Sequence, residues 1–243
     1  ILHIVLTDKY YFTPIKSFSI MTSNQLKLLA FACMVADHAS KAFLLPDGGF
    51  SNVIVMIGRT SFPIFAFCIA QGYLHTSNIG LYQWRLLLFG ILAQPFYITC
   101  LSLPVNTLNT LFTFLISITI LRILDSKPII VIDGSKGLDY MLKIGALSLL
   151  ALWLIPLMPL EIHVDYGIAG IALPILLRYI SKIKLQSVAI FIWGVVTFGA
   201  LGSIWNIIGV GIASALICTY SYQRGYLHKY TFYVLYVAHL VVL

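Results

Sequence analysis

The chain has 243 residues, of which 60% are hydrophobic and only 9% are charged, and its formal net charge at pH 7 is +7. Its mean hydropathy is +0.97. Soluble domains carry about 25% charged residues, so this chain has too little polar surface to cover itself in water. The composition therefore excludes an ordinary soluble protein and predicts an all-α, polytopic integral membrane protein surrounded by membrane lipid. We expect the cations to set the orientation of the helices rather than to bind nucleic acid.

The predicted organisation is a short lead-in followed by one transmembrane domain. Residues 1–25 include several charged side chains and form an amphipathic or disordered lead-in, whereas residues 26–243 form a single helical bundle. A spanning helix needs about 20 apolar residues, and runs of about that length recur between turn-forming stretches such as PDGG. The nine predicted helices cover residues 26–45, 51–74, 82–101, 107–124, 141–159, 164–180, 185–202, 204–221 and 230–243.

Lysine and arginine residues gather in alternate connections between these helices. They precede or open the first helix and follow the second, fourth, sixth and eighth helices, whereas the intervening connections hold almost none, with Lys41 as the exception. Because cytoplasmic loops carry the excess of Lys and Arg, this pattern predicts a cytoplasmic N-terminus and an external C-terminus. That arrangement requires an odd number of helices, which favours nine.

Four ionisable side chains within the predicted helices are the main candidates for a functional site: Asp37 and His38 in the first, Arg59 in the second and His239 in the last. At about 1.5 Å per residue, His38, Arg59 and His239 lie roughly 16, 12 and 15 Å from the faces where their helices enter, near the middle of an about 30 Å core. Ionisable residues within a membrane usually face the bundle interior or a water-filled cavity and mark functional sites. We therefore expect these side chains to converge on one site.

Structural interpretations of the same residues stay open. Asp37 and Arg59 fit a buried ion pair that pins the first two helices together, and His239 fits a histidine that is simply satisfied within the core. Adjacent helix positions point about 100° apart, so Asp37 is poorly placed to orient the imidazole of His38. We expect Asp37 to pair with Arg59 or Lys41, while His38 faces a cavity.

Other polar positions are expected to matter less. Asp165 and His163 lie near the external end of the sixth helix, where both fit an interfacial position. Asn109 fits a helix cap at the start of the fourth helix, and His75 fits a solvated histidine at the cytoplasmic end of the second. The chain contains no HExxH, P-loop, GxGxxG or CxxC pattern. Metal binding, nucleotide hydrolysis and redox chemistry therefore lack support, and we expect no metal.

Six stretches of the sequence carry a resemblance to a known family. They are LKLLAFACMVADHASKAF, IGRTSFPIFAF, RLLLFGILAQPFY, NTLFTF, DYGIAGI and FYVLYVAHLVVL, and they run from about residue 26 to residue 243. In their order and spacing they resemble the TraX family, multi-pass membrane proteins of conjugative plasmids and of some bacterial chromosomes. The most specific parts of the resemblance are Asp37 with His38, Gly58 with Arg59, Phe62 with Pro63, and His239.

The resemblance implies an activity. The founding member acetylates the N-terminal residue of processed conjugative pilin with acetyl-CoA as donor, and the family is similar to transmembrane acyltransferases that carry a histidine on an early helix. It implies the bacterial inner membrane as location and a pilin subunit as partner. His38 would then act as general base, and Arg59 would stabilise the oxyanion or hold Asp37. Asp37 would set the local electrostatics, and His239 would serve as a second hydrogen-bond donor or as a proton shuttle.

The two substrates are expected to arrive from opposite faces of the membrane. Cations on the cytoplasmic side would meet the phosphates of acetyl-CoA. The candidate contacts for acetyl-CoA are Arg85, His75 and Arg178, and those for the acceptor are Asp165, Tyr166 and Asn109.

Three other functions stay open at this point. The acceptor could be a sugar hydroxyl of a surface glycan. The ionisable residues could instead form the relay of a proton-coupled transporter of small solutes, although the sequence lacks the paired repeats that such transporters often show. The chain could also serve pilus assembly in a purely structural role.

Overall fold

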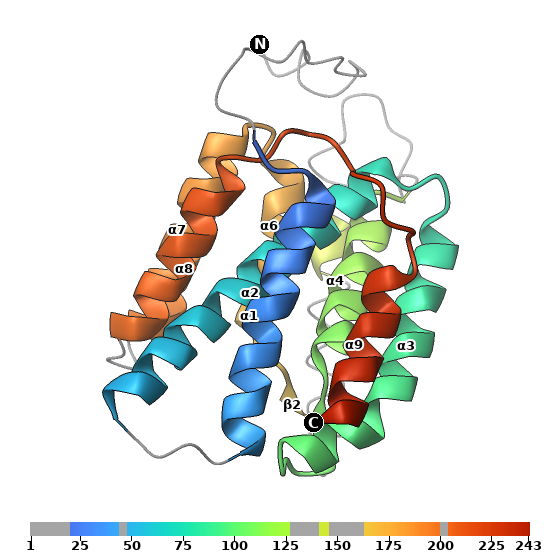
Figure 1. Cartoon of the computed structure of the whole chain (residues 1–243). Helices are drawn as coiled ribbons and strands as arrows, with labels where there is room; N and C mark the ends of the chain where they lie inside the picture. Colours follow the sequence, from blue (N-terminus) through green and yellow to red (C-terminus); the bar gives the residue numbers. More distant parts are fainter. Residues whose placement is uncertain (1–19, 44–47, 127–140, 146–162, 200–203) are drawn as a thin grey trace, which may run out of the picture.

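The computed structural model describes residues 20–43, 48–126, 141–145, 163–199 and 204–243. Within these ranges the protein is helical apart from two short strands (Figure 1). The strands β1 (Thr107–Leu108) and β2 (His163–Val164) pair in parallel. The labelled helices are α1 (Ser23–Ala42), α2 (Gly49–His75), α3 (Ile79–Cys100), α4 (Thr110–Leu124), α6 (Gly167–Tyr179), α7 (Ile183–Gly199), α8 (Ile204–Ile217) and α9 (Thr231–Val242), and residues 141–145 are also helical.

The described helices confirm the helical class and follow the predicted order along the chain. The fifth predicted helix is described only over residues 141–145, and most of the predicted lead-in, residues 1–19, lies outside the described ranges. α1 begins three residues earlier than predicted because Thr22 caps it. The Thr22 hydroxyl accepts a hydrogen bond from the backbone N–H of Gln25, whose side chain in turn accepts one from the backbone N–H of Thr22. This capping box satisfies two donors that would otherwise be unpaired at the helix start.

The starts of α4 and α6 differ from the prediction because the chain forms β1 and β2 there. The predicted helices begin at residues 107 and 164, whereas α4 begins at Thr110 and α6 at Gly167. The side chain of Asn109 accepts a hydrogen bond from the N–H of Leu111 and so caps α4, as expected from the sequence. The strand pair holds the first turn of α4 beside the first turn of α6.

The described helices form two groups, one around α2 and the other around α3. α2 packs against α1 and α8, and α8 packs against α7, whereas α3 packs against α4 and α9 (Figure 1). α6 contacts both α2 and α4 and so joins the two groups. Fully buried apolar side chains, including Ile64, Phe67, Leu86, Ile118 and Leu173, form one core across them.

The outer helix faces are apolar. Phe191 and Val196 of α7 and Ile212 of α8 are exposed at the surface of the bundle. Among the described helices, α2 has the length and hydropathy to cross a membrane, with 27 residues and a mean hydropathy of 1.9, while five shorter helices of 10–17 residues are also apolar. Since soluble proteins seldom expose large apolar patches, these faces and the composition indicate a helical membrane protein.

Candidate functional site

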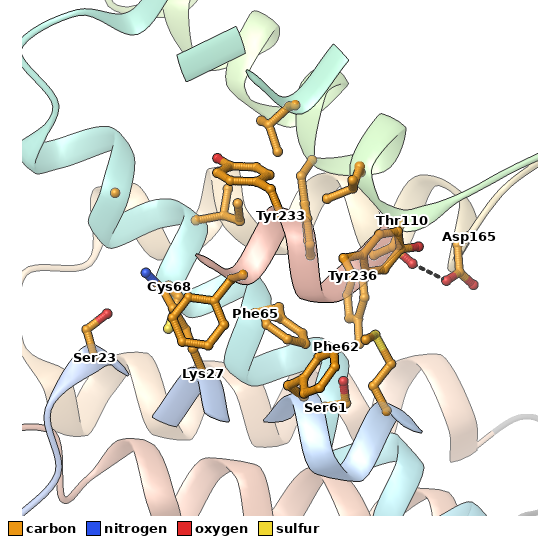
Figure 2. A pocket seen from close by; sticks show the side chains of 18 of the residues that line it. Ser23, Lys27, Ser61, Phe62, Phe65, Cys68, Thr110, Asp165, Tyr233 and Tyr236 are labelled. Carbon is orange, nitrogen blue, oxygen red and sulfur yellow. Dashed lines mark hydrogen bonds between the residues drawn. The ribbon is translucent and has the colours of Figure 1, made fainter. Parts of the chain in front are cut away.

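A cavity of about 1170 Å³ runs between the helices from the start of α1 to the start of α6. Figure 2 shows Ser23 and Lys27 on one side of it, Thr110 and Asp165 on the other, and Phe62 between them. The charged residues of the lining separate into two groups, one toward each end. We call Lys27, Arg85, Arg224 and Lys229 the basic end, and Asp37, His38, Lys41, Arg59 and Asp165 the histidine end.

His38 and His239 meet at the histidine end, although they are 201 residues apart in the chain. Nδ1 of His38 lies 3.0 Å from Nε2 of His239, and the two rings are stacked with their centroids 5.2 Å apart. Both side chains are buried, but His38 lines the cavity whereas His239 does not. His239 therefore contacts His38 from outside the cavity lining.

The position of His239 on α9 indicates how the protons are arranged. Nδ1 of His239 lies 3.3 Å from the backbone carbonyl oxygen of Leu235, which can only accept a hydrogen bond. Nδ1 of His239 therefore carries a proton, and in the neutral ring Nε2 is left as an acceptor. His38 must then donate from Nδ1, which leaves the lone pair on its own Nε2. The chain from Leu235 through His239 to His38 thus selects the His38 tautomer with a basic Nε2.

Asp37 pairs with Lys41 rather than with Arg59. Nζ of Lys41 donates to Oδ2 of Asp37 at 2.6 Å, one helical turn further along α1. The other carboxylate oxygen has no hydrogen-bond partner in the described part of the chain, and the carboxyl group packs against Gly58 of α2. A Cβ atom at residue 58 would lie 2.5 Å from Cβ of Asp37, so only glycine lets α1 and α2 approach this closely.

Arg59 is held by neutral groups instead of a carboxylate. Nη1 donates to the Tyr166 hydroxyl at 3.0 Å, and Nε donates to Oδ1 of Asn206 at 3.3 Å. The guanidinium also lies over the rings of Tyr166 and Phe198, 5.6 and 5.5 Å from their centroids. Sequence analysis missed Asn206, which lies in an otherwise apolar stretch of α8 and has no local signal. A partly buried cation without a paired anion can stabilise negative charge that develops in the cavity.

The stretch Asp165–Gly167 forms a tight turn at the start of α6. Tyr166 and Gly167 both have positive φ angles, 61° and 56°, which are uncommon for a tyrosine and ordinary for a glycine. The turn stacks Tyr166 on Phe62, with ring centroids 3.9 Å apart, and Thr110 donates a hydrogen bond to the Asp165 carboxylate. Asp165 lies outside the helices, and burial raises the pKa of its carboxyl group. Asp165 and Tyr166 both line the cavity.

Besides His239, two of the candidate site residues, Arg178 and Asn109, do not line the cavity. Arg178 forms an ion pair with Asp125 at 3.3 Å and stacks on Tyr73 and Tyr179. Asn109 is fully buried, and besides capping α4 its side chain donates to the carbonyl oxygen of Gly90. Both roles are structural.

The remaining candidate contacts for acetyl-CoA, Arg85 and His75, line the cavity. Both lie near the start of α1, with His75 exposed and within hydrogen-bond distance, 2.8 Å, of the Gln71 carbonyl oxygen. Lys27, Arg224 and Lys229 line the same end. In the sequence these three cations indicated only how the helices are oriented in the membrane.

The structure places the two histidines close to the ends of their helices. His38 lies four residues before the end of α1 at Ala42, and His239 lies three residues before the end of α9 at Val242, so both are within roughly 6 Å of a helix end. Arg59 is ten residues into α2, roughly 15 Å from its start. The site therefore lies toward one end of the bundle, because α1 begins before Lys27 and α9 is short.

Among the described residues, no three His, Cys, Asp or Glu side chains gather in a way that could hold a metal ion. The chemistry available at the histidine end is therefore that of an imidazole base, a guanidinium and two carboxylates.

Comparison with known proteins identifies relatives of the chain. It is 31% identical over 113 residues to a protein of Dichelobacter nodosus described as probable fimbrial assembly protein FimC, serogroup H1; the aligned part is 42% of this chain and 46% of the relative. The chain thus spans about half the length of this relative. No solved structure matches the chain. The TraX protein family matches residues 22–243, which include both ends of the cavity. The chain therefore belongs to the TraX family.

Proposed function

We propose that this protein is an acetyltransferase of the bacterial inner membrane that transfers acetyl from acetyl-CoA to the N-terminal amine of processed conjugative pilin. Family membership and the fimbrial assembly protein among its relatives support a role in pilus formation or conjugation. The observation that carries the proposed reaction is the position of His38 on the cavity wall, with His239 behind it at 3.0 Å.

The proposed topology follows the charge pattern. With the N-terminus cytoplasmic and about nine spanning helices, the basic end of the cavity faces the cytoplasm and the histidine end lies toward the external side. Acetyl-CoA would enter at the basic end, where Arg85 and His75 lie, and the pilin terminus would enter near Asp165 and Tyr166. A cavity lined from one end of α1 to the other supports substrates that arrive from opposite faces.

In the proposed reaction His38 acts as general base. The amine nitrogen attacks the thioester carbonyl carbon, a carbon–nitrogen bond forms, and the carbon–sulfur bond of the donor breaks. Nε2 of His38 takes the proton released by the nitrogen and passes it to the leaving thiolate, so that the imidazole is neutral again at the end. His239 keeps Nδ1 of His38 in a hydrogen bond throughout and is therefore a positioning residue.

Arg59 would stabilise the oxyanion of the tetrahedral intermediate. Its hydrogen bonds to Asn206 and Tyr166 use Nε and Nη1, which leaves other N–H groups of the guanidinium for an oxyanion, on a side chain that lines the cavity. Preorganised donors aimed at developing charge commonly supply the largest part of such catalysis. Asp37, neutralised by Lys41, would keep the charge near His38 balanced.

The decisive experiment is the intact mass of pilin co-expressed with this protein. Wild-type protein should add one acetyl group to the pilin N-terminus, and His38→Ala should lower the acetylated fraction in a timed assay by at least about 100-fold. His163→Ala is the matched control, because His163 is exposed on β2 and does not line the cavity. Unmodified pilin with well-expressed wild-type protein would refute the proposal, as would full activity of His38→Ala.

A proton-coupled transporter is the second candidate, because a cavity that reaches both ends of the bundle is also what transport needs. The two functions differ in their requirement for a membrane gradient. Acetylation by purified protein in detergent, where no gradient exists, would exclude the transporter. A glycan acceptor would instead show acetyl groups on surface polysaccharide and none on pilin.

A further inference from the structure

Among the described residues, the basic end of the cavity has no counter-ion. Four cationic side chains line it, and two histidines, His75 and His228, lie among them. The carboxylates that line the cavity, Asp37 and Asp165, both lie at the histidine end. In the described part of the chain the cavity is therefore electrically polarised, with unneutralised positive charge at one end.

The connection from α8 to α9, which carries Arg224 and Lys229, is joined to the start of α1 by backbone hydrogen bonds. The backbone N–H groups of Ser23 and Asn24 donate to the carbonyl oxygens of Gln223 and Arg224, at 2.8 and 3.0 Å. In the amide orientation that pairs donors with acceptors, the buried Asn24 side chain accepts from the N–H of Leu227 at 2.6 Å. The first donors of α1 are thus already occupied, and the positive charge at this end comes from side chains rather than from free helix N–H groups.

Cations at the basic end also lie over aromatic rings. Lys27 lies over Phe232, and Arg85 lies over Tyr82, each 5.5 Å from the ring centroid. Nε of Arg85 is buried and has no hydrogen-bond partner among the described residues. Cation–π contacts orient these groups without neutralising them, so their positive charge and the Nε donor of Arg85 remain for an anion.

The distance between the two ends limits the ligand. Lys27 and His38 are both on α1 and 11 residues apart, which corresponds to roughly 16 Å along the helix. The wall between them is largely apolar and aromatic, with Phe31 of α1 and Phe65 of α2. A ligand that uses both ends must carry its anionic groups at one end and its reactive group at the other, joined by a long uncharged arm.

We propose that the basic end binds the phosphate groups of the acyl donor, so that a pantetheine-type arm lies along the cavity and presents the thioester to His38. This inference rests on the proposed acyl transfer. It adds Lys27, Arg224 and Lys229 to Arg85 as the residues that recognise the donor, and it fixes the direction in which the donor lies.

Binding of non-reactive coenzyme A to purified protein tests this assignment. Lys27→Gln, Arg224→Gln and Lys229→Gln should each weaken binding about three- to tenfold, since each removes one charge-assisted contact. Lys184→Gln is the control, because Lys184 is an exposed cation that does not line the cavity. Arg224 and Lys229 are exposed, so loss of folding will not mask the effect if Lys27→Gln proves unstable. Equal affinity of all variants and the control would overturn the proposal.

A series of shortened probes tests the role of the phosphates directly. Affinity should fall from coenzyme A to dephospho-coenzyme A, and pantetheine without phosphate should bind weakest. Pantetheine binding as tightly as coenzyme A would overturn the proposal. The phosphate could also come from a lipid headgroup, so binding is repeated in neutral micelles with added phosphatidylglycerol. If this lipid displaces coenzyme A, and if the displacement depends on Arg224 and Lys229, the basic end is a lipid site and the proposal is overturned.

The binding experiment is independent of turnover, because it can be done with His38→Ala protein. Coenzyme A binding that depends on the basic end, without acetylation of pilin, would leave this inference standing and refute the proposed acceptor. Acetylation of pilin with an unchanged KM for acetyl-CoA in the three variants would refute the inference and leave the proposed function standing.

Discussion

At the basic end of the cavity two of the four cations are exposed, and none of the four has a carboxylate partner among the described residues, whereas at the histidine end most charged side chains are buried or half-buried and held by a neighbour within the protein. Arg224 and Lys229 are exposed on the connection before α9, while His38 contacts His239 and Asp37 contacts Lys41. Exposed charges act over distance and tolerate small displacements, but buried contacts depend on exact partners. Substitutions should therefore have large, geometry-dependent effects at the histidine end and small, additive effects at the basic end.

The largest of these effects is expected for Arg59→Lys. Lysine keeps the charge but cannot bond to the Tyr166 hydroxyl and Asn206 together while also pointing a donor into the cavity. We expect kcat for acetyl transfer to fall about 100- to 1000-fold, the usual cost of losing an oxyanion donor. The measurement is the initial rate at saturating donor.

Arg122→Lys is the matched control for this substitution. Arg122 is an exposed arginine of α4 whose Nη1 donates to Gln83 outside the cavity, so its replacement should leave kcat unchanged. Wild-type rates for Arg59→Lys would show that Arg59 only positions Tyr166.

His239 should come next, with an outcome that depends on the replacement. His239→Ala removes the partner of His38 Nδ1, and kcat should fall about 10- to 100-fold with little change in KM. His239→Gln can accept from His38 through its carbonyl oxygen and donate to the Leu235 carbonyl through its amide, so it should recover most of the rate. The measurement is kcat and KM for both variants. Equal loss in both would mean that His239 does more than position His38, for example as a proton carrier.

Gly58→Ala tests the packing on which the histidine end depends. The added Cβ would overlap Asp37, and the free energy of unfolding should fall by about 1–3 kcal/mol. In Gly211→Ala the nearest atom would be an ordinary 3.6 Å away, on Phe191, so this helix substitution should be neutral or stabilising. Thermal unfolding of both variants in the same detergent measures the difference. A stable Gly58→Ala protein would show that α1 and α2 can separate without loss of fold.

The sequence predicts features that depend on local patterns better than contacts between distant helices. Helix positions depend on local apolar runs, so they were predicted to within a few residues at most described ends. The Asp37–Lys41 pair was one of two predicted alternatives, because residues four apart on a helix are always neighbours.

The contacts of the histidine end depend on how distant helices pack, which no local pattern encodes. The sequence placed His38 and His239 at similar depths, but their direct contact across 201 residues follows from α9 packing against α1 and α3. The partners of Arg59 could not be read from the sequence for the same reason: Asn206 is one amide in an apolar helix, and Tyr166 reaches Arg59 only because the chain turns there with two positive φ angles.

Added salt should have the smallest of the predicted effects, and it should act on donor binding at the basic end but not on the chemical step at the histidine end. The screening length falls from about 10 Å at 0.1 M to about 3 Å at 1 M, so exposed cations lose most of their long-range attraction. We expect the KM for acetyl-CoA to rise several-fold with added salt, because Arg224 and Lys229 face solvent, and this rise to shrink in Arg224→Gln. The value of kcat should stay constant, because His38 is only 9% exposed and its contact with the buried His239 is screened little. A salt-dependent kcat with a constant KM would reverse the assignment of the two ends, since it would place the solvent-accessible charges in the chemical step and not in donor binding.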